Sequence, residues 1–258
     1  MHRRTDNVGN LYETTTLTDR IYASGSKLTH TKVNTNELKN IYQGGHGKLV
    51  TKGTEFSYDE EGNLTRKTQA NGDVWQYYYY GNGMMSKVIR PDNTVISFKY
   101  DSLGRRIEKK TPERTKHFVW DGNKPLHEWE DENLITWVFD DGYAPVAKLT
   151  AQGNYSIIAD HLGTPAEAYD ADGNCVWSAE LDIFGRVKEF TGEVDFIPFR
   201  YQGQYNDLET GLYYNRFRYY SPEEGGYTQP DPIGLAGKNP TLYGYVWDPN
   251  NPYFHGRD

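Results

Sequence analysis

Aromatic and polar residues alternate along most of the chain, in segments that recur about every twenty residues. Clear examples are FSYDEEGNLTRK, YYYYGNGMMSKVIR, FKYDSLGRRIEKK, FVWDGNKPLHEW and WVFDDGYAPVAKL. In each segment two aromatic residues flank one other residue, Asp or Gly follows, and a second run comes after the turn. The second aromatic residues are Tyr58, Tyr80, Tyr100, Trp120 and Phe139, at spacings of 22, 20, 20 and 19 residues. This period predicts one β-hairpin and its connection in each repeat.

The segment FKYDSLGRR shows the physics of one repeat. Phe98 and Tyr100 are two positions apart, so both rings are predicted to point to one face of a strand. Asp101 is expected to open the turn, since its carboxylate can accept hydrogen bonds from the backbone N–H groups just ahead. Gly104 stands where a positive φ is expected. A single hairpin is marginally stable in water, so we expect the hairpins to stack into one array, as in a solenoid.

Weaker copies extend the array in both directions. Turns are predicted upstream near Gly9, Gly25 and Gly47, and downstream near Gly163, Gly173 and Gly185. The one candidate helix, residues 34–42, is too short to predict with any force. No linker or low-complexity segment divides the chain. The pattern therefore predicts one continuous all-β array.

Composition narrows the classes of function. Tyr (22 residues) far outnumbers Met (3 residues), which favours strands over a helical core. The formal net charge of −8 argues against a nucleic-acid partner, which normally needs a basic face. No apolar run approaches the roughly 18 residues of a membrane span, and no signal peptide is recognised at the N-terminus.

Residues suited to cofactor or metal chemistry are sparse. The seven histidines are scattered without ligand spacing, so neither a metal site nor a bound cofactor is predicted. Cys175 is the only cysteine, and no disulfide can form within the chain. We expect Cys175 to be a small buried side chain in a strand.

Two longer segments carry a family resemblance. They are DHLGTPAEAYDADGNCVWSAELDIFG and RYQGQYNDLETGLYYNRFRYYSPEEGGYTQPDPIGLAGKNPTLYGYV. Together with the repeats, they resemble the tyrosine-aspartate (YD) repeat proteins of the rearrangement-hot-spot (RHS) family, over roughly residues 55–250. Several long motifs in the right order are more specific than any one short motif.

The resemblance implies a fold and a division of the chain. In RHS proteins consecutive hairpins form a curved, spiralling sheet, and we expect this chain to be part of such a shell or cocoon. It implies divergent repeats at residues 1–50 and the main β-array at residues 51–190. The RHS-associated core, which plugs the shell, would span residues 191–250, and a tail would follow at residues 251–258.

The resemblance also implies a function. The chain is expected to be a non-enzymatic shell segment of a bacterial toxin system, which encloses and delivers a C-terminal toxin in competition between bacteria. Its expected partners are the rest of the shell or the toxin domain, components of a secretion system such as type VI, and an immunity protein. It would act outside the cell when delivered and otherwise lie in the cytoplasm. Since a second D-P-x-G-L motif is absent, we expect a truncated or orphan fragment without its own toxin.

A self-cleaving activity is the first alternative. Family members carry an aspartic-protease-like activity, and the motif D-P-x-G-L falls on residues 231–235. Asp231 is therefore the candidate catalytic carboxylate, with Asp248 as its candidate partner, because acid proteolysis needs two carboxylates that share a proton. The alternative for Asp231 is a carboxylate that caps a turn before proline. Departures from the family pattern at Ser221 and at Gly225–Tyr227 favour a vestigial activity.

A surface function is the second alternative. The tyrosine-rich segment 200–237 could form an aromatic platform for carbohydrate in an adhesion module, or its rings could stack inside the sheet. Ring stacking is favoured because the same aromatic spacing recurs elsewhere. Arg200, Arg216 and Arg218 are then expected to stack on rings or pair with carboxylates. Open sheet edges predict self-association of the isolated chain.

Overall fold

The computed structural model describes residues 4–32, 53–234 and 241–245, and nearly all of its regular structure is β-strand. Strands β3 to β18 form one 16-stranded antiparallel sheet in which each strand pairs with its neighbours in sequence. These strands are β3 (Arg20–Ala23), β4 (Lys27–Thr31), β5 (Glu55–Tyr58), β6 (Leu64–Thr68), β7 (Val74–Tyr79), β8 (Met85–Ile89), β9 (Val95–Tyr100), β10 (Arg106–Lys110), β11 (Thr115–Asp121), β12 (Lys124–Glu130), β13 (Asn133–Phe139), β14 (Pro145–Thr150), β15 (Gly153–Ala159), β16 (Pro165–Tyr169), β17 (Cys175–Leu181) and β18 (Val187–Thr191).

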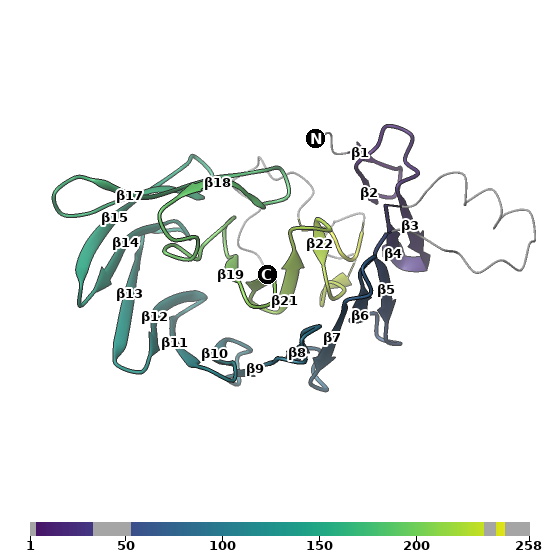
Figure 1. The fold of residues 1–258 in the computed structure, drawn as a ribbon, viewed down its shortest axis with the longest axis horizontal. Helices are drawn as coiled ribbons and strands as arrows, with labels where there is room; N and C mark the ends of the chain where they lie inside the picture. The colour runs from purple at the N-terminus through teal and green to yellow at the C-terminus, as the bar shows by residue number, and fades with distance from the viewer. Residues whose placement is uncertain (1–3, 33–52, 235–240, 246–258) are drawn as a thin grey trace, which may run out of the picture.

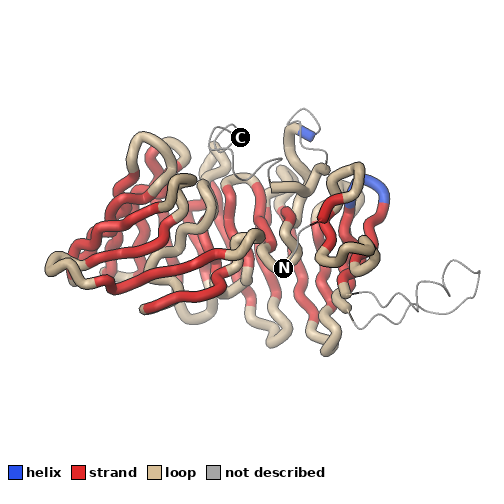
Figure 2. The backbone as a smooth tube through the Cα atoms, turned by 90° about the horizontal axis from the view of Figure 1, so that it is seen from above, coloured by secondary structure: helices blue, strands red, loops and turns tan. Residues whose placement is uncertain are grey.

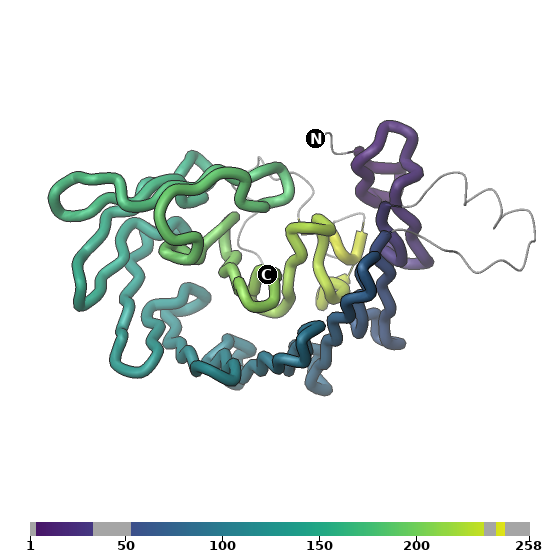
Figure 3. The backbone as a smooth tube through the Cα atoms, viewed as in Figure 1, coloured from purple at the N-terminus to yellow at the C-terminus, as the bar shows by residue number. Residues whose placement is uncertain are grey.

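A second sheet lies inside the curve of the first (Figures 1 and 3). It has four antiparallel strands, β19 (Tyr205–Asp207), β20 (Leu212–Asn215), β21 (Arg218–Ser221) and β22 (Gly226–Tyr227). Near the N-terminus, β1 (Arg4–Thr5) pairs with β2 (Leu11–Tyr12), and a short 3-10 turn, η1 (Ser24–Ser26), joins β3 to β4. Figure 2 shows the strands of the large sheet side by side, with turns along both rims. The predicted all-β fold with a curved sheet is confirmed.

The hairpin turns obey the predicted local rule. Asp101 Oδ1 accepts hydrogen bonds from the N–H groups of Leu103 (2.9 Å) and Arg105 (2.8 Å), and Gly104 has a φ of +77°. The main chain of Asp101 also donates its N–H to the Arg105 carbonyl and accepts from the Gly104 N–H. The same pair of backbone bonds closes the turns that begin at Asp6, Asp59, Asp160, Asp170 and Asp182. The helix candidate at residues 34–42 and the turn at Gly47 lie outside the described residues.

The apolar core lies between the two sheets. On β9, Ile96 and Phe98 are fully buried while Val95 is 42% exposed, as alternation requires. The same core includes Trp137 and Trp177 from the large sheet and Tyr214 from the second sheet. A one-residue shift would turn each buried ring outward, so the burial of one face fixes the strand register.

The prediction that Cys175 is buried is wrong. Cys175 is exposed, although it is in a strand as expected. It is the first residue of β17 and pairs with Tyr169, the last residue of β16, directly beyond an exposed turn. Its position at the rim of the sheet, next to an exposed turn, accounts for the exposure.

Candidate functional site

The segment that lines the inside of the curved sheet, residues 196–231, is here named the inner segment. Its tyrosines alternate between two faces. Tyr205, Tyr214 and Tyr219 pack in the core against the large sheet, whereas Tyr213 and Tyr220 pack with Tyr227 and Tyr245 on the other face. The tyrosines of β19 to β22 are all buried. These tyrosines pack against other rings in tilted or edge-on contacts inside the protein, and they are not available as an exposed carbohydrate platform.

A fully buried ion pair joins the inner segment to the large sheet. Arg106 on β10 and Asp207 on β19 both have no exposed side-chain surface, and the two guanidinium nitrogens of Arg106 face the two oxygens of Asp207. The guanidinium also lies 4.4 Å from the centre of the Tyr214 ring and 4.8 Å from that of Phe118. Burial opposes the charge, but the Asp207 carboxylate outweighs it and raises the pKa of Arg106.

Further charges extend this pair towards solvent. Lys109 Nζ lies 3.1 Å from Asp207 Oδ1 and 2.7 Å from Glu209 Oε2, and Arg114 Nη2 lies 2.8 Å from Glu209 Oε1. Burial alone would raise the pKa of Glu209, but the two cations outweigh it and lower the pKa to about 2. We call Arg106, Lys109, Arg114, Asp207 and Glu209 the charge cluster.

A second set of charges holds the other end of the inner segment. Lys67 Nζ on β6 lies 3.0 Å from Glu223 Oε2 and 2.9 Å from Glu224 Oε1. Arg20 on β3 donates from Nη1 to the Glu224 carbonyl oxygen at 2.6 Å. The two sets of contacts fix the inner segment at two places along the large sheet.

Asp231 lies at the end of the inner segment, in a turn. Its Oδ2 is 3.2 Å from Arg218 Nη2, and the two side chains are 10% and 5% exposed. Its Oδ1 accepts the N–H of Ile233 at 3.0 Å. The Arg218 guanidinium also lies 3.7 Å from the centre of the Tyr227 ring, as expected for an arginine among these rings. Asp231 thus caps a turn and pairs with a buried cation.

A comparison with protein-family models shows the family of this chain. The Teneurin YD-shell family model matches residues 2–252. The chain belongs to the YD-shell family. Double-stranded DNA deaminase toxin A of Burkholderia cenocepacia (strain H111) is 30% identical over 244 residues, which cover 81% of this chain and 17% of that protein. Probable deoxyribonuclease RhsB of Dickeya dadantii (strain 3937) is 31% identical over 222 residues, which cover 79% and 15%. The resemblance to RHS proteins is therefore confirmed.

Solved structures support the shell fold. The structure described as TcdB2-TccC3-Cdc42 matches with a TM-score of 0.56 and 16% sequence identity, over 99% of this chain and 16% of that one. The structure described as TcdB2-TccC3 matches with a TM-score of 0.54 and 19% identity, over 98% of this chain and 13% of that one. The YD-shell chain thus spans less than a fifth of the length of each of these proteins.

Of the two candidate protease residues, the structure describes only Asp231. Asp231 has the geometry described above, and Asp248 lies outside the described residues. A catalytic role for either one stays a prediction. The described residues hold no cluster of three metal-ligating side chains, and no helix among them has the length and apolar character of a membrane span.

The charge cluster was not predicted from the sequence of the YD-shell chain. A signal for it was nevertheless present in the repeats. In two other repeats the residue two positions after the turn glycine is apolar and buried, namely Leu64 and Met85. Arg106 stands at the equivalent position of its own repeat and is also buried. Three residues further on, Lys109 stands where another repeat has the buried Val88. A charged residue at an inward repeat position predicts a buried partner of opposite charge.

Proposed function

We propose that this chain is a wall segment of an RHS-type shell together with the polypeptide that fills its inner side, in a system that encloses and delivers a toxin. The names of its relatives support the toxin context: the RHS protein of Dickeya dadantii is a probable deoxyribonuclease and the Burkholderia protein is a deaminase toxin. The proposal places the chain outside the producing cell after delivery, with the remaining shell, the toxin domain and a secretion system as partners.

The observation that carries the proposal is the buried pair between Arg106 and Asp207. A wall that must enclose cargo needs a defined curvature and a filler at a defined place. Apolar rings alone tolerate sliding, whereas a desolvated charge must meet its partner to avoid a large penalty. The charge cluster therefore suits a segment whose position on the inner face is fixed.

A competition assay tests the proposal. A strain that carries the gene is grown with a strain that lacks it, and an in-frame deletion of the gene should abolish the competitive advantage. Arg106→Met should also abolish it, while Arg105→Met, in the adjacent turn, should preserve it. No change in competition after deletion would refute a role in toxin delivery.

Open edges supply a second, biochemical test. Among the described residues, β3 and β18 end the large sheet and pair on one side only. Unpaired strand edges are sites of association, so the isolated chain should self-associate unless further shell polypeptide covers them. Light scattering at micromolar concentration should show species larger than a monomer. A monomeric profile would contradict the expected role of the edges.

Self-cleavage through Asp231 is the second candidate function. Its support is a cavity of about 600 Å³ that Asp231 lines together with Asp59 and Glu61, which brings carboxyl groups from two parts of the chain to one cavity. Intact mass should then show discrete cleavage in the wild-type protein and none in Asp231→Asn. Asp92→Asn, at an exposed turn, is the matched control and should cleave normally. An unchanged wild-type mass across acidic and neutral pH would exclude this activity.

A further inference from the structure

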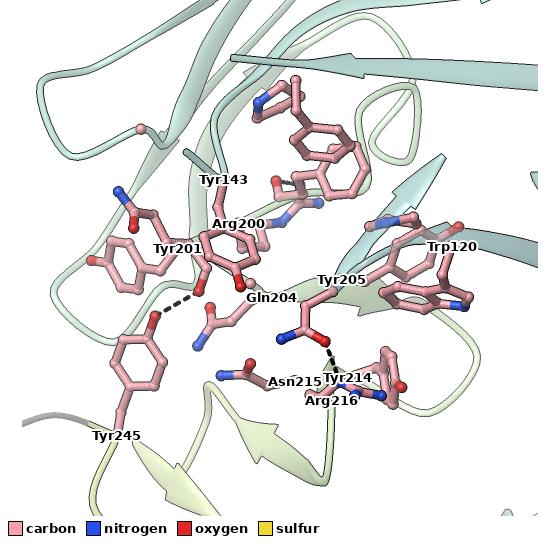
Figure 4. A pocket seen from close by; sticks show the side chains of 18 of the residues that line it. Trp120, Tyr143, Arg200, Tyr201, Gln204, Tyr205, Tyr214, Asn215, Arg216 and Tyr245 are labelled. Atoms are coloured by element: carbon pink, nitrogen blue, oxygen red, sulfur yellow. Dashed lines mark hydrogen bonds between the residues drawn. The ribbon is translucent and has the colours of Figure 1, made fainter. Parts of the chain in front are cut away.

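A small cavity opens where the inner segment meets one rim of the large sheet (Figure 4). Its volume is about 90 Å³. The sheet contributes turn residues such as Asn123 and Tyr143, and the inner segment contributes Tyr201, Gln204 and Asn215. Asn123 is exposed, so the cavity reaches the surface at the rim.

Gln204 is the unusual residue of this cavity. It is 1% exposed, yet neither Oε1 nor Nε2 has a hydrogen-bond partner among the described residues. Its main chain is fully used: the N–H donates to the Tyr201 carbonyl at 2.9 Å, and the carbonyl accepts from the Arg200 N–H at 3.1 Å. In Figure 4 the Gln204 side chain lies amid Tyr201, Asn215 and Tyr245. A buried amide with both functions unpaired is costly, which points to a group that binds there.

The unpaired atoms define what that group must offer. Gln204 presents one acceptor and an N–H donor side by side on a planar amide. A primary carboxamide, as in Asn or Gln side chains, has a donor and an acceptor on the same edge and can return both bonds. A main-chain peptide or the N-acetyl group of a sugar is a trans secondary amide, whose N–H and C=O point in opposite directions. Such a group can meet only one of the two atoms.

The volume of the cavity is also compatible with a primary carboxamide. The cavity of about 90 Å³ is smaller than the roughly 150 Å³ cavity that holds a benzene ring. A carboxamide on a short methylene stem is small enough for this space. The rings of Trp120 and Tyr143, which also line the cavity, suit the apolar stem.

Arg216 adds a second donor to the same cavity. Its Nε is engaged with Asn123 Oδ1 at 3.1 Å, but its buried Nη1 has no partner among the described residues. A carboxamide oxygen has two lone pairs, so it can accept from Gln204 and from a second donor at once.

We propose that this cavity receives the side-chain carboxamide of an asparagine or glutamine from a second polypeptide segment. The segment would lie along the exposed rim turns and insert one side chain next to Gln204. This recognition of a polypeptide at the rim does not depend on toxin delivery or on self-cleavage.

Nuclear magnetic resonance of the side-chain amide groups in the intact chain tests the proposal. Propionamide, a primary amide, should shift the Gln204 side-chain signals in a saturable manner. N-methylacetamide, the matched trans secondary amide, should bind at least about tenfold more weakly, because it loses one of the paired bonds. The peptide acetyl-Gly-Asn-Gly-N-methylamide, whose only primary carboxamide is the Asn side chain, should also bind, with acetyl-Gly-Asp-Gly-N-methylamide as its control.

Variants make the test specific. Gln204→Met has a similar volume and no hydrogen-bonding atoms, so it should keep the fold and abolish the response, read from the signals of Asn215 and Arg216. Gln204→Glu is a second variant, which keeps an acceptor and loses the donor. It should weaken propionamide binding by about tenfold, because one of the paired bonds is lost. Equal responses to the two amide probes, no saturable response, or an unchanged response in both variants would overturn the proposal.

Discussion

The large sheet and the inner segment are stabilised by different kinds of interaction. A hairpin turn of the large sheet is closed by bonds within five residues, as from Asp101 to the N–H groups of Leu103 and Arg105. The inner segment is joined to that sheet by contacts between residues about 100 positions apart, as between Arg106 and Asp207. The first kind repeats along the chain, and the second occurs at particular places.

This difference has an energetic meaning. Ion pairs at the exposed face of the sheet, such as Lys188 with Glu180, contribute about 0–1 kcal/mol because water screens them. Removal of one partner of a buried pair costs about 3–5 kcal/mol, because the other charge stays desolvated. Local turns thus build the sheet, and a few buried charges set where the inner segment lies on it.

The largest expected effect comes from Arg106→Met. The change leaves the Asp207 carboxylate buried with only Lys109 as a cation, so the free energy of unfolding should fall by about 3–5 kcal/mol. Chemical denaturation followed by tryptophan fluorescence measures this change.

Arg105→Met is the control for that variant. Arg105 is paired with Asp101 in a half-exposed turn, and its loss should cost about 1 kcal/mol or less. The double variant Arg106→Met/Asp207→Leu should recover part of the stability, because no uncompensated charge remains. Equal effects of the two single variants would show that the buried pair does not set the position of the inner segment.

The next largest effect is a pH dependence carried by Glu209. Its pKa is lowered to about 2 in the folded protein, so the ionised form stabilises the fold at pH values above the ordinary pKa of 4.5. This stabilisation, up to about 3 kcal/mol, should be lost as the pH falls from about 4.5 to about 2. Glu209→Gln should flatten the stability profile in that window. Glu180→Gln, in an exposed pair, should leave it unchanged, and a flat wild-type profile would contradict the prediction.

A smaller effect distinguishes two turns with the same local geometry. Gly104 and Gly173 have φ values of +77° and +83°, so alanine is strained by about 1–2 kcal/mol at either position. A Cβ at Gly104 would also lie 3.0 Å from Phe217 Cε1 of the inner segment and 3.2 Å from Met84 Sδ, while at Gly173 it meets nothing within 4 Å. Gly104→Ala should therefore cost about 1 kcal/mol more than Gly173→Ala in denaturation experiments. Identical costs would mean that Phe217 moves aside freely.

The smallest expected effect is at Lys148. Burial lowers its pKa to about 8, so the folded state disfavours the ammonium, and this penalty is present below pH 8 and relieved as the pH rises towards 10.5. Lys148→Met removes the penalty but leaves the Phe196 carbonyl without its donor at 2.9 Å. At pH 7 the free energy of unfolding of the variant should be equal to that of the wild type or higher by up to about 1 kcal/mol. Thermal unfolding measures this difference. A loss as large as that of Arg106→Met would show that Lys148 is an essential cation.

The repeats made much of the sheet predictable because each turn depends on residues a few positions apart. Asp101 and Gly104 show this, since a carboxylate and a positive φ are properties of the segment itself. Cys175 was predicted wrongly because its exposure depends on its position at the rim, which the pattern of one strand does not contain. Asp207 was missed because its partner is more than 90 residues away in the sequence.

By itself the sequence determined the all-β class, the repeating hairpins and the inward side of the ring-bearing strands, since alternation and turn chemistry act over a few residues. Only the tertiary structure decided which of these strands meets the inner segment, that Arg106 pairs with Asp207, and that Gln204 faces a cavity. Those outcomes depend on the curvature of sixteen strands taken together, which brings distant residues into one desolvated space where charge and hydrogen bonding must balance.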